Sequence, residues 1–96
     1  MAYIAGELFE WDTDKSAANL RIRGFDFEYA AKIFRRPVLE RDDTRSVYGE
    51  RRIQAIGCIR REVLFVVYTW RGAARRIISA RPANRRERNA YRQIHG

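Results

Sequence analysis

The chain has 96 residues, 46% of them hydrophobic, which predicts one globular domain over residues 1–96 with a modest core. One cysteine, Cys58, excludes an internal disulfide, and one histidine, His95, argues against a zinc site. No apolar run approaches the ~20 residues of a membrane span, and the first residues lack the features of a secretory signal. We therefore expect a cytoplasmic protein that uses neither metal nor cofactor.

The net charge is +8, and 18 of the 20 basic residues are arginine. Residues 1–50 hold 8 bases and 10 acids, whereas residues 51–96 hold 12 bases and 2 acids. A high-GC genome would enrich arginine over lysine, but it would not separate the two halves in this way. The basic half therefore predicts an anionic partner, either a nucleic acid or an acidic protein.

The N-terminal half predicts one strand and two helices. The strand ends near Trp11, and the first helix runs from an N-cap at Asp12 to a left-handed C-cap at Gly24. Ala17, Leu20 and Trp11 are expected to face the core. The second helix follows at once, and its cap is Asp26.

The apolar side chains of this second helix recur at the spacing of one helical face, at Phe27, Ala30, Ala31 and Phe34. Pro37 ends the helix. The polar segment 38–50 is predicted to be a connecting loop, with or without a brief strand at Val38–Leu39.

The C-terminal half predicts three antiparallel strands and a helix. Residues 63–70, VLFVVYTW, are typical of a central strand buried on both faces. Asn84 and Glu87 have the spacing of a capping box and begin the last helix. The predicted order is β-α-α-β-β-β-α, an α+β fold with a small antiparallel sheet, two N-terminal helices and a C-terminal helix.

Arginines at the strand ends are the main candidates for chemistry, because no catalytic triad, phosphate loop or metal motif is present. Arg71 and Arg81 end two paired strands, so they either form a two-pronged anion clamp or simply flank the core. Simple alternation also places Ile77, Ser79 and Arg81 on one face of the last strand. Glu50 is either a general base or a structural partner of its neighbour Arg52.

The last helix predicts a basic stripe at Arg85, Arg88 and Arg92, which is either a solvated face or part of a functional patch. On its other side, we expect Ala90, Tyr91 and Ile94 to dock on the sheet.

These residues also carry a resemblance to the BrnT family. The matching motifs are FEWD at Phe9–Asp12, Lys15 with Asn19, the segment Gly24–Ala30, Glu50 with Arg52 and Gly57, VVYTWR at Val66–Arg71, and RIISAR with its helix at Arg76–Tyr91.

The resemblance implies the toxin of a type II toxin–antitoxin system, with a RelE-like fold and endoribonuclease activity of the RNA interferase type that inhibits translation. It also implies a BrnA-like antitoxin in a heterotetramer that binds operator DNA through the antitoxin. We expect RNA cleavage without metal, in which the substrate's own 2′-hydroxyl attacks the phosphate. The expected catalytic residues are Glu50, Arg52, Arg71 and Arg81, and the expected substrate-binding residues are Arg23, Arg76, Arg85 and Tyr91.

One departure bears on activity, because Ile22 and Arg23 stand where the family usually has lysine and histidine. Arginine does not readily exchange a proton. Glu50 or a tyrosine then takes that role, or the arginines act electrostatically, or activity is weak. The alternative function is a catalytically weakened or inactive binding module for an antitoxin or nucleic acid, and the fold alone also admits gyrase poisoning.

Overall fold

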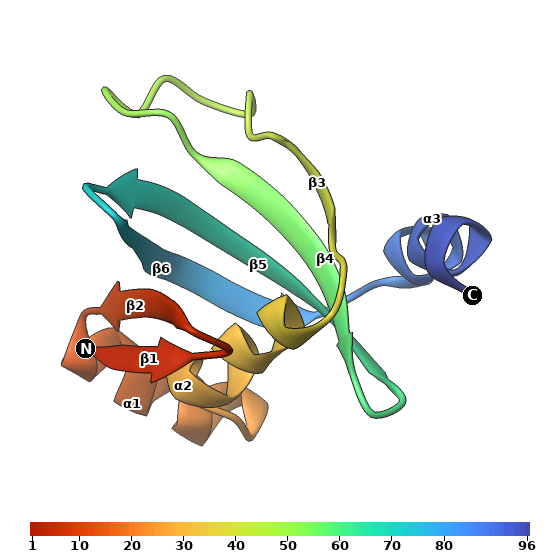
Figure 1. The fold of residues 1–96 in the computed structure, drawn as a ribbon, viewed down its shortest axis with the longest axis horizontal. Coiled ribbons are helices and arrows are strands. Elements are labelled where there is room, and N and C mark those ends of the chain that lie inside the picture. Colours follow the sequence, from red (N-terminus) through yellow and green to blue (C-terminus); the bar gives the residue numbers. More distant parts are fainter.

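The computed structural model describes residues 1–96 as one six-stranded sheet with helices against it (Figure 1). The elements are β1 (Ala2–Ile4), β2 (Glu7–Trp11), α1 (Thr13–Arg23), α2 (Phe27–Ala30), the 3₁₀ helix η1 (Ala31–Arg35), β3 (Leu39–Asp42), β4 (Ile53–Ile59), β5 (Glu62–Arg71), β6 (Ala74–Pro82) and α3 (Arg85–His95). The predicted α+β class is confirmed. No helix is long and apolar enough to cross a bilayer.

The sheet order is β1-β2-β6-β5-β4-β3, so the predicted C-terminal meander is confirmed as β4, β5 and β6. The sheet is mixed rather than antiparallel, because β2 lies parallel to β6. The predicted single N-terminal strand is two strands, since Ala5 and Gly6 both have positive φ and reverse the chain between β1 and β2. Segment 38–50 contributes an edge strand, β3, which pairs with β4.

Helix α1 has the predicted caps but not the predicted inner face. The Asp12 side chain accepts from the Lys15 amide at 3.0 Å, and Gly24 closes the helix in the left-handed region. Ala17 is exposed and Leu20 is 51% exposed, so the predicted apolar contact is wrong.

Polar side chains hold α1 to the next segment instead. Ser16 Oγ accepts from the backbone N–H of Phe27 at 2.9 Å, and Asn19 Nδ2 donates to the Phe25 carbonyl at 2.9 Å. Each pairs a backbone group of the α2 entry that would otherwise be unsatisfied. The outer face of α1 is consequently free to carry exposed apolar and basic residues.

The second helix begins as predicted, with the Asp26 side chain accepting from the Tyr29 amide at 2.8 Å. It tightens to a 3₁₀ helix at Ala31, which changes the side chains that point inward. Ile33 is fully buried, whereas the predicted core residue Phe34 is only half-buried. The helix still ends before Pro37.

Strand β5 is buried on both faces, as its continuous apolar run predicts. Leu64, Val66 and Tyr68 belong to the main core under the helical layer. On the other face, Val63 packs with Ala83 and with Tyr91 of α3. The predicted docking of α3 therefore holds for Tyr91 but not for Ile94, which is 63% exposed.

A register shift between Val67 and Tyr68 changes the faces of β6. Val67 pairs with Ser79 and Tyr68 pairs with Ile77, so Ile78 is the extra residue of a bulge. Ile77 and Ala80 consequently both lie in the core, and the simple alternation predicted for this strand is wrong.

We expect Gly57→Ala to destabilise the protein, because η1 lies directly against this strand position. A Cβ on Gly57 would lie 2.6 Å from Ile33 Cβ and 3.0 Å from Val38 Cγ1. Overpacking of this kind costs about 1–3 kcal/mol. Urea unfolding measures the change, and an unchanged midpoint would contradict the close packing of η1 on β4.

Candidate anion-binding site

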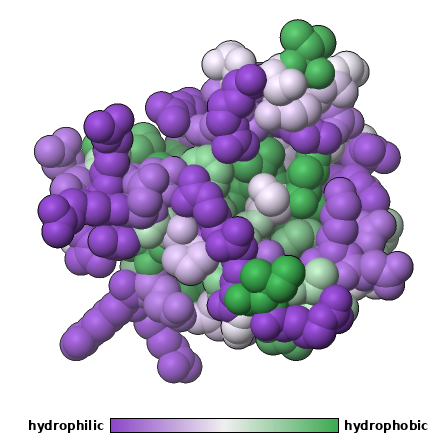
Figure 2. Space-filling model, turned by 180° about the vertical axis from the view of Figure 1, so that it is seen from behind, coloured by the Kyte–Doolittle hydropathy of each residue, from purple (hydrophilic) through white to green (hydrophobic).

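The sheet face opposite the main core carries an aromatic ring covered by arginines. The Phe65 ring of β5 lies 4.1 Å from the guanidinium carbon of Arg81 and 5.8 Å from that of Arg45. In Figure 1, η1 lies in front of the sheet, and Figure 2 views the molecule from behind. Hydrophobic residues are visible there in a hollow, surrounded by hydrophilic residues with projecting side chains. A cation over an aromatic face is attracted by the ring's negative quadrupole.

Each of these two arginines is fixed by a carboxylate. Arg81 donates to the two Glu87 oxygens at 2.8 and 2.9 Å, and Arg45 donates to the two Asp43 oxygens at 2.8 and 2.9 Å. Hydrogen bonds from Arg45 lower the pKa of Asp43 to about 2, and those from Arg81 lower the pKa of Glu87. Both acids are therefore ionised at neutral pH, and both guanidinium groups are held in place.

A cavity of about 400 Å³ lies beside Phe65, between α1 and β6, and we call it the α1–β6 cavity. Four cations line it: Lys15 and Arg23 from α1, Arg45 from the loop after β3, and Arg81 from β6. Asn19, Ile22, Ser79 and Phe65 also line it, and no acidic residue does. Arg45 and Arg81 are paired with carboxylates that do not line the cavity, whereas Lys15 and Arg23 have no ion-pair partner. The cavity suits a small anionic group such as a phosphate.

Glu50, Arg52 and Arg71 form a separate cluster. Glu50 accepts from Arg52 at 3.2 Å and lies 3.6 Å from Arg71, and the Arg52 guanidinium stacks 4.0 Å from the Tyr48 ring. The Tyr48 hydroxyl donates to Asp43 at 3.4 Å, which links this cluster to the Arg45 pair. None of the three candidate residues lines the α1–β6 cavity.

The predicted clamp of Arg71 and Arg81 is wrong. Arg71 is in register with Ala74, and Arg81 is in register with Phe65, so the two positions are six residues apart along β5. At ~3.3 Å per residue, this is about 20 Å. The C-terminal ends of two antiparallel strands lie at opposite ends of the pair, so arginines at both C-terminal ends cannot converge on one anion. Arg81 lies with Arg23 instead.

The remaining predicted residues lie apart from the cavity. Arg76 pairs with Glu10 at 2.9 Å, and Arg85 is exposed on the first turn of α3. Tyr91 is buried, and its hydroxyl donates to the Pro37 carbonyl at 3.3 Å, which ties α3 to the segment between η1 and β3.

Sequence patterns did not identify Arg45 or the covering of Phe65. The segment around Arg45 lacks periodicity, and its only local signal is Asp43 two residues earlier, which allows a short-range carboxylate–guanidinium pair.

An α+β domain with fixed arginines around an acid-free cavity is equipped to bind anionic groups. The chain also matches, over residues 11–87, the family model described as "Ribonuclease toxin, BrnT, of type II toxin-antitoxin system". The protein therefore belongs to the BrnT family of ribonuclease toxins, and a type II system implies an antitoxin partner. No match was found among curated proteins.

We expect Asp43→Asn to weaken the protein at neutral pH and to reduce its acid sensitivity. The pKa of Asp43 in the folded state, about 2, is below the ordinary value of ~3.9. Its pairing therefore stabilises the fold fully above about pH 4 and is lost as the pH falls toward 2. Removing one partner of a buried charged hydrogen bond costs about 1–3 kcal/mol.

Unfolding in urea at several pH values measures this effect. The wild-type free energy of unfolding should fall more steeply below about pH 4 than that of the variant. Parallel curves would contradict the role of Asp43 as an ionised anchor for Arg45.

Proposed function

We propose that this protein is a toxin that cleaves single-stranded RNA without a metal ion and thereby inhibits translation. The scissile phosphate binds in the α1–β6 cavity. The supporting observation is that Lys15, Arg23, Arg45 and Arg81 line one cavity of about 400 Å³ that no carboxylate lines. The family match supports the choice of RNA as the polyanion.

In the proposed reaction, the 2′-hydroxyl oxygen attacks the adjacent phosphorus and the bond to the 5′-oxygen breaks. The products are a 2′,3′-cyclic phosphate and a 5′-hydroxyl, whose proton comes from solvent. Negative charge accumulates on the equatorial oxygens of the pentavalent transition state. Arginines that are already held in position stabilise this charge without reorganising, which is an effective form of electrostatic catalysis.

The cavity contains no residue that is suited to accept the proton of the 2′-hydroxyl. Neither histidine nor a carboxylate lines the cavity, and Glu50 is occupied by Arg52 and Arg71. We therefore assign Glu50 to positioning these two arginines, and removal of the 2′-hydroxyl proton to solvent. A slow ribonuclease that acts through its arginines follows from this arrangement.

The antitoxin is proposed to be BrnA-like and to form a heterotetramer that binds operator DNA. A RelE-like arrangement of the sheet and helices is part of the same proposal. The support is the family match together with the α+β architecture.

Replacing Arg81, which lies over Phe65, tests the proposed ribonuclease activity. We expect Arg81→Ala to lower RNA cleavage by about 10²–10³-fold, as for loss of one transition-state donor. Binding to an uncleavable RNA should weaken only in part. Induced wild-type protein should arrest bacterial growth and fragment RNA, whereas Arg81→Ala should not arrest it.

Glu87→Gln is the matched control, because it removes the charge of the ion pair but keeps the Arg81 guanidinium and an amide oxygen that can accept from it. It should lose much less activity than Arg81→Ala. Growth arrest that persists unchanged with Arg81→Ala would reject the proposed role of this residue.

The pH profile tests the proton step. The wild-type cleavage rate should rise with pH and show no titration limb near neutrality. The double variant Ile22→Lys/Arg23→His places an imidazole at the cavity wall, so cleavage should rise and gain a limb near pH ~6.5. A bell-shaped wild-type profile around neutrality would reject solvent as the proton acceptor.

A non-catalytic binding module is the second candidate. It is favoured by the ion pairing of Arg52, Arg71 and Arg81 and by the missing proton acceptor. On this hypothesis, purified protein leaves RNA intact, and growth does not respond to Arg81→Ala or to the Lys-His double variant.

A further inference from the structure

We propose that a second basic region binds the phosphates of the same RNA strand outside the cleavage site. It lies around the β4–β5 turn, and we call it the hairpin-end groove. Its cations are Lys32, Arg35, Arg36, Arg60, Arg61 and Arg92. The choice of RNA rests on the proposed ribonuclease function.

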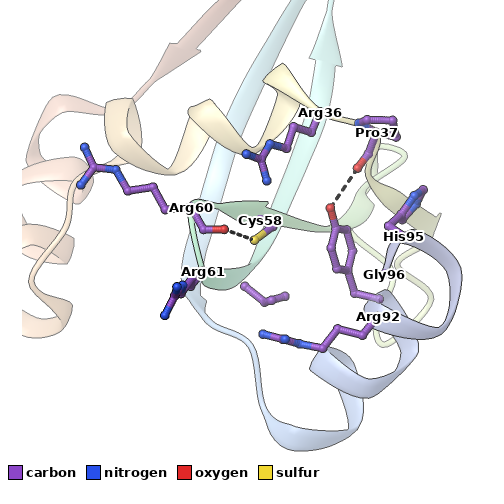
Figure 3. Close-up of a pocket in the computed structure, with 10 residues that line it drawn as sticks. Arg36, Pro37, Cys58, Arg60, Arg61, Arg92, His95 and Gly96 are labelled. Carbon is purple, nitrogen blue, oxygen red and sulfur yellow. Dashed lines mark hydrogen bonds between the residues drawn. The ribbon is translucent and has the colours of Figure 1, made fainter.

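The larger part of the groove is a hollow of about 560 Å³. Three elements supply its arginines: Arg36 follows η1, Arg61 lies in the β4–β5 turn, and Arg92 lies on α3. Figure 3 shows Arg36 and Arg92 extending into the hollow from opposite sides, with Arg61 at its edge. A group bound between them would meet guanidinium donors from more than one direction, as a phosphate requires.

A smaller hollow of about 350 Å³ continues the groove past Arg60, and the two hollows share Arg36, Cys58 and Arg60. The Arg60 carbonyl accepts from Cys58, while its side chain extends away from the larger hollow (Figure 3). Lys32 and Arg35 add charge on that side. Two contiguous hollows fit a chain of anionic groups better than one isolated anion.

No ion pair within the protein neutralises the cations of this groove. None of its six cations forms an ion pair, and no acidic residue lines either hollow. The acidic residue Glu62 follows Arg61 in the chain and accepts, at 2.6 Å, from the hydroxyl of Tyr29, which lines the smaller hollow. By contrast, Arg45 and Arg81 of the α1–β6 cavity are held by carboxylates. The unpaired cations of the groove therefore contribute affinity for RNA phosphates, whereas the paired arginines of the cavity hold one phosphate in a fixed geometry.

The two sites share no lining residue but lie close together on β5. Val63 lines the groove and Phe65 lines the cavity. The two residues are two positions apart, which is about 7 Å along the strand. A strand of RNA that places one phosphate in the cavity can consequently continue into the groove, and this continuity favours RNA over an acidic peptide as the occupant.

The test compares two triple variants that remove the same charge. Arg36→Ala/Arg61→Ala/Arg92→Ala removes one cation from each wall of the larger hollow. Arg21→Ala/Arg41→Ala/Arg86→Ala removes three exposed arginines elsewhere that also form no ion pair. The probes are 2′-O-methyl RNA oligonucleotides of about 4 and about 16 nucleotides, the range of site sizes found for single-strand-binding OB folds. They lack the attacking hydroxyl and so report binding alone, by fluorescence anisotropy at several salt concentrations.

We expect the groove variant to bind the longer probe about tenfold more weakly, with a salt slope smaller by about 2, as three lost phosphate contacts require. The short probe should bind nearly as it does to wild type. The control variant should change the slope by less than about 1. Equal thermal unfolding midpoints would show that all three proteins are folded.

Equal weakening by both triple variants would overturn the proposal, because net charge alone would then explain binding. Unchanged RNA binding by the groove variant, together with lost binding of a poly-glutamate peptide, would overturn it in favour of an acidic protein partner. The nuclease is judged separately on unmodified RNA. If wild type binds the long probe through the groove but cleaves nothing, the groove stands and the ribonuclease proposal fails.

Discussion

The sheet has a helical layer on one face only, and most of the site's features follow from the need to cover the other face. Strand β5 is apolar on both sides, so Val63 and Phe65 must be shielded without a second full layer. Helix α3 covers Val63, and two guanidinium groups cover Phe65. The carboxylates of Asp43 and Glu87 keep those planar groups on the ring. The arginine side chains therefore both cover the apolar ring and supply positive charge to the site.

The arginines accordingly fall into two groups with different uses. Seven are ion-paired, and most of these lie on or beside the sheet: Arg45, Arg51, Arg52, Arg71, Arg75, Arg76 and Arg81. Most of the charge that remains free lies on α1, on α3 and around the β4–β5 turn. The excess of basic residues in the C-terminal half therefore suggests more free positive charge on the sheet face than the structure has there. It suggests less than the structure has around the β4–β5 turn.

The sequence predicted correctly those features that depend on residues close together in the chain. The caps at Asp12, Asp26 and Asn84 and the buried run of β5 depend on residues close in sequence, and the structure confirms them. The pairing of β2 with β6 and the bulge at Ile78 depend on how distant segments meet, which periodicity does not encode.

The same limit applied to the site. Arg81 was identified from its strand position, but its true neighbours, Arg23 and Arg45, come from a helix and an irregular loop. Antiparallel register places it far from Arg71.

Glu87 links the cavity to helix α3, because one of its oxygens accepts from both the Asn84 amide and Arg81. A phosphate that binds the remaining N–H groups of Arg81 competes with Glu87 for the same positive charge while the guanidinium stays in place. Amide hydrogen exchange in the first turn of α3 should therefore respond to occupancy of a cavity that this turn does not line.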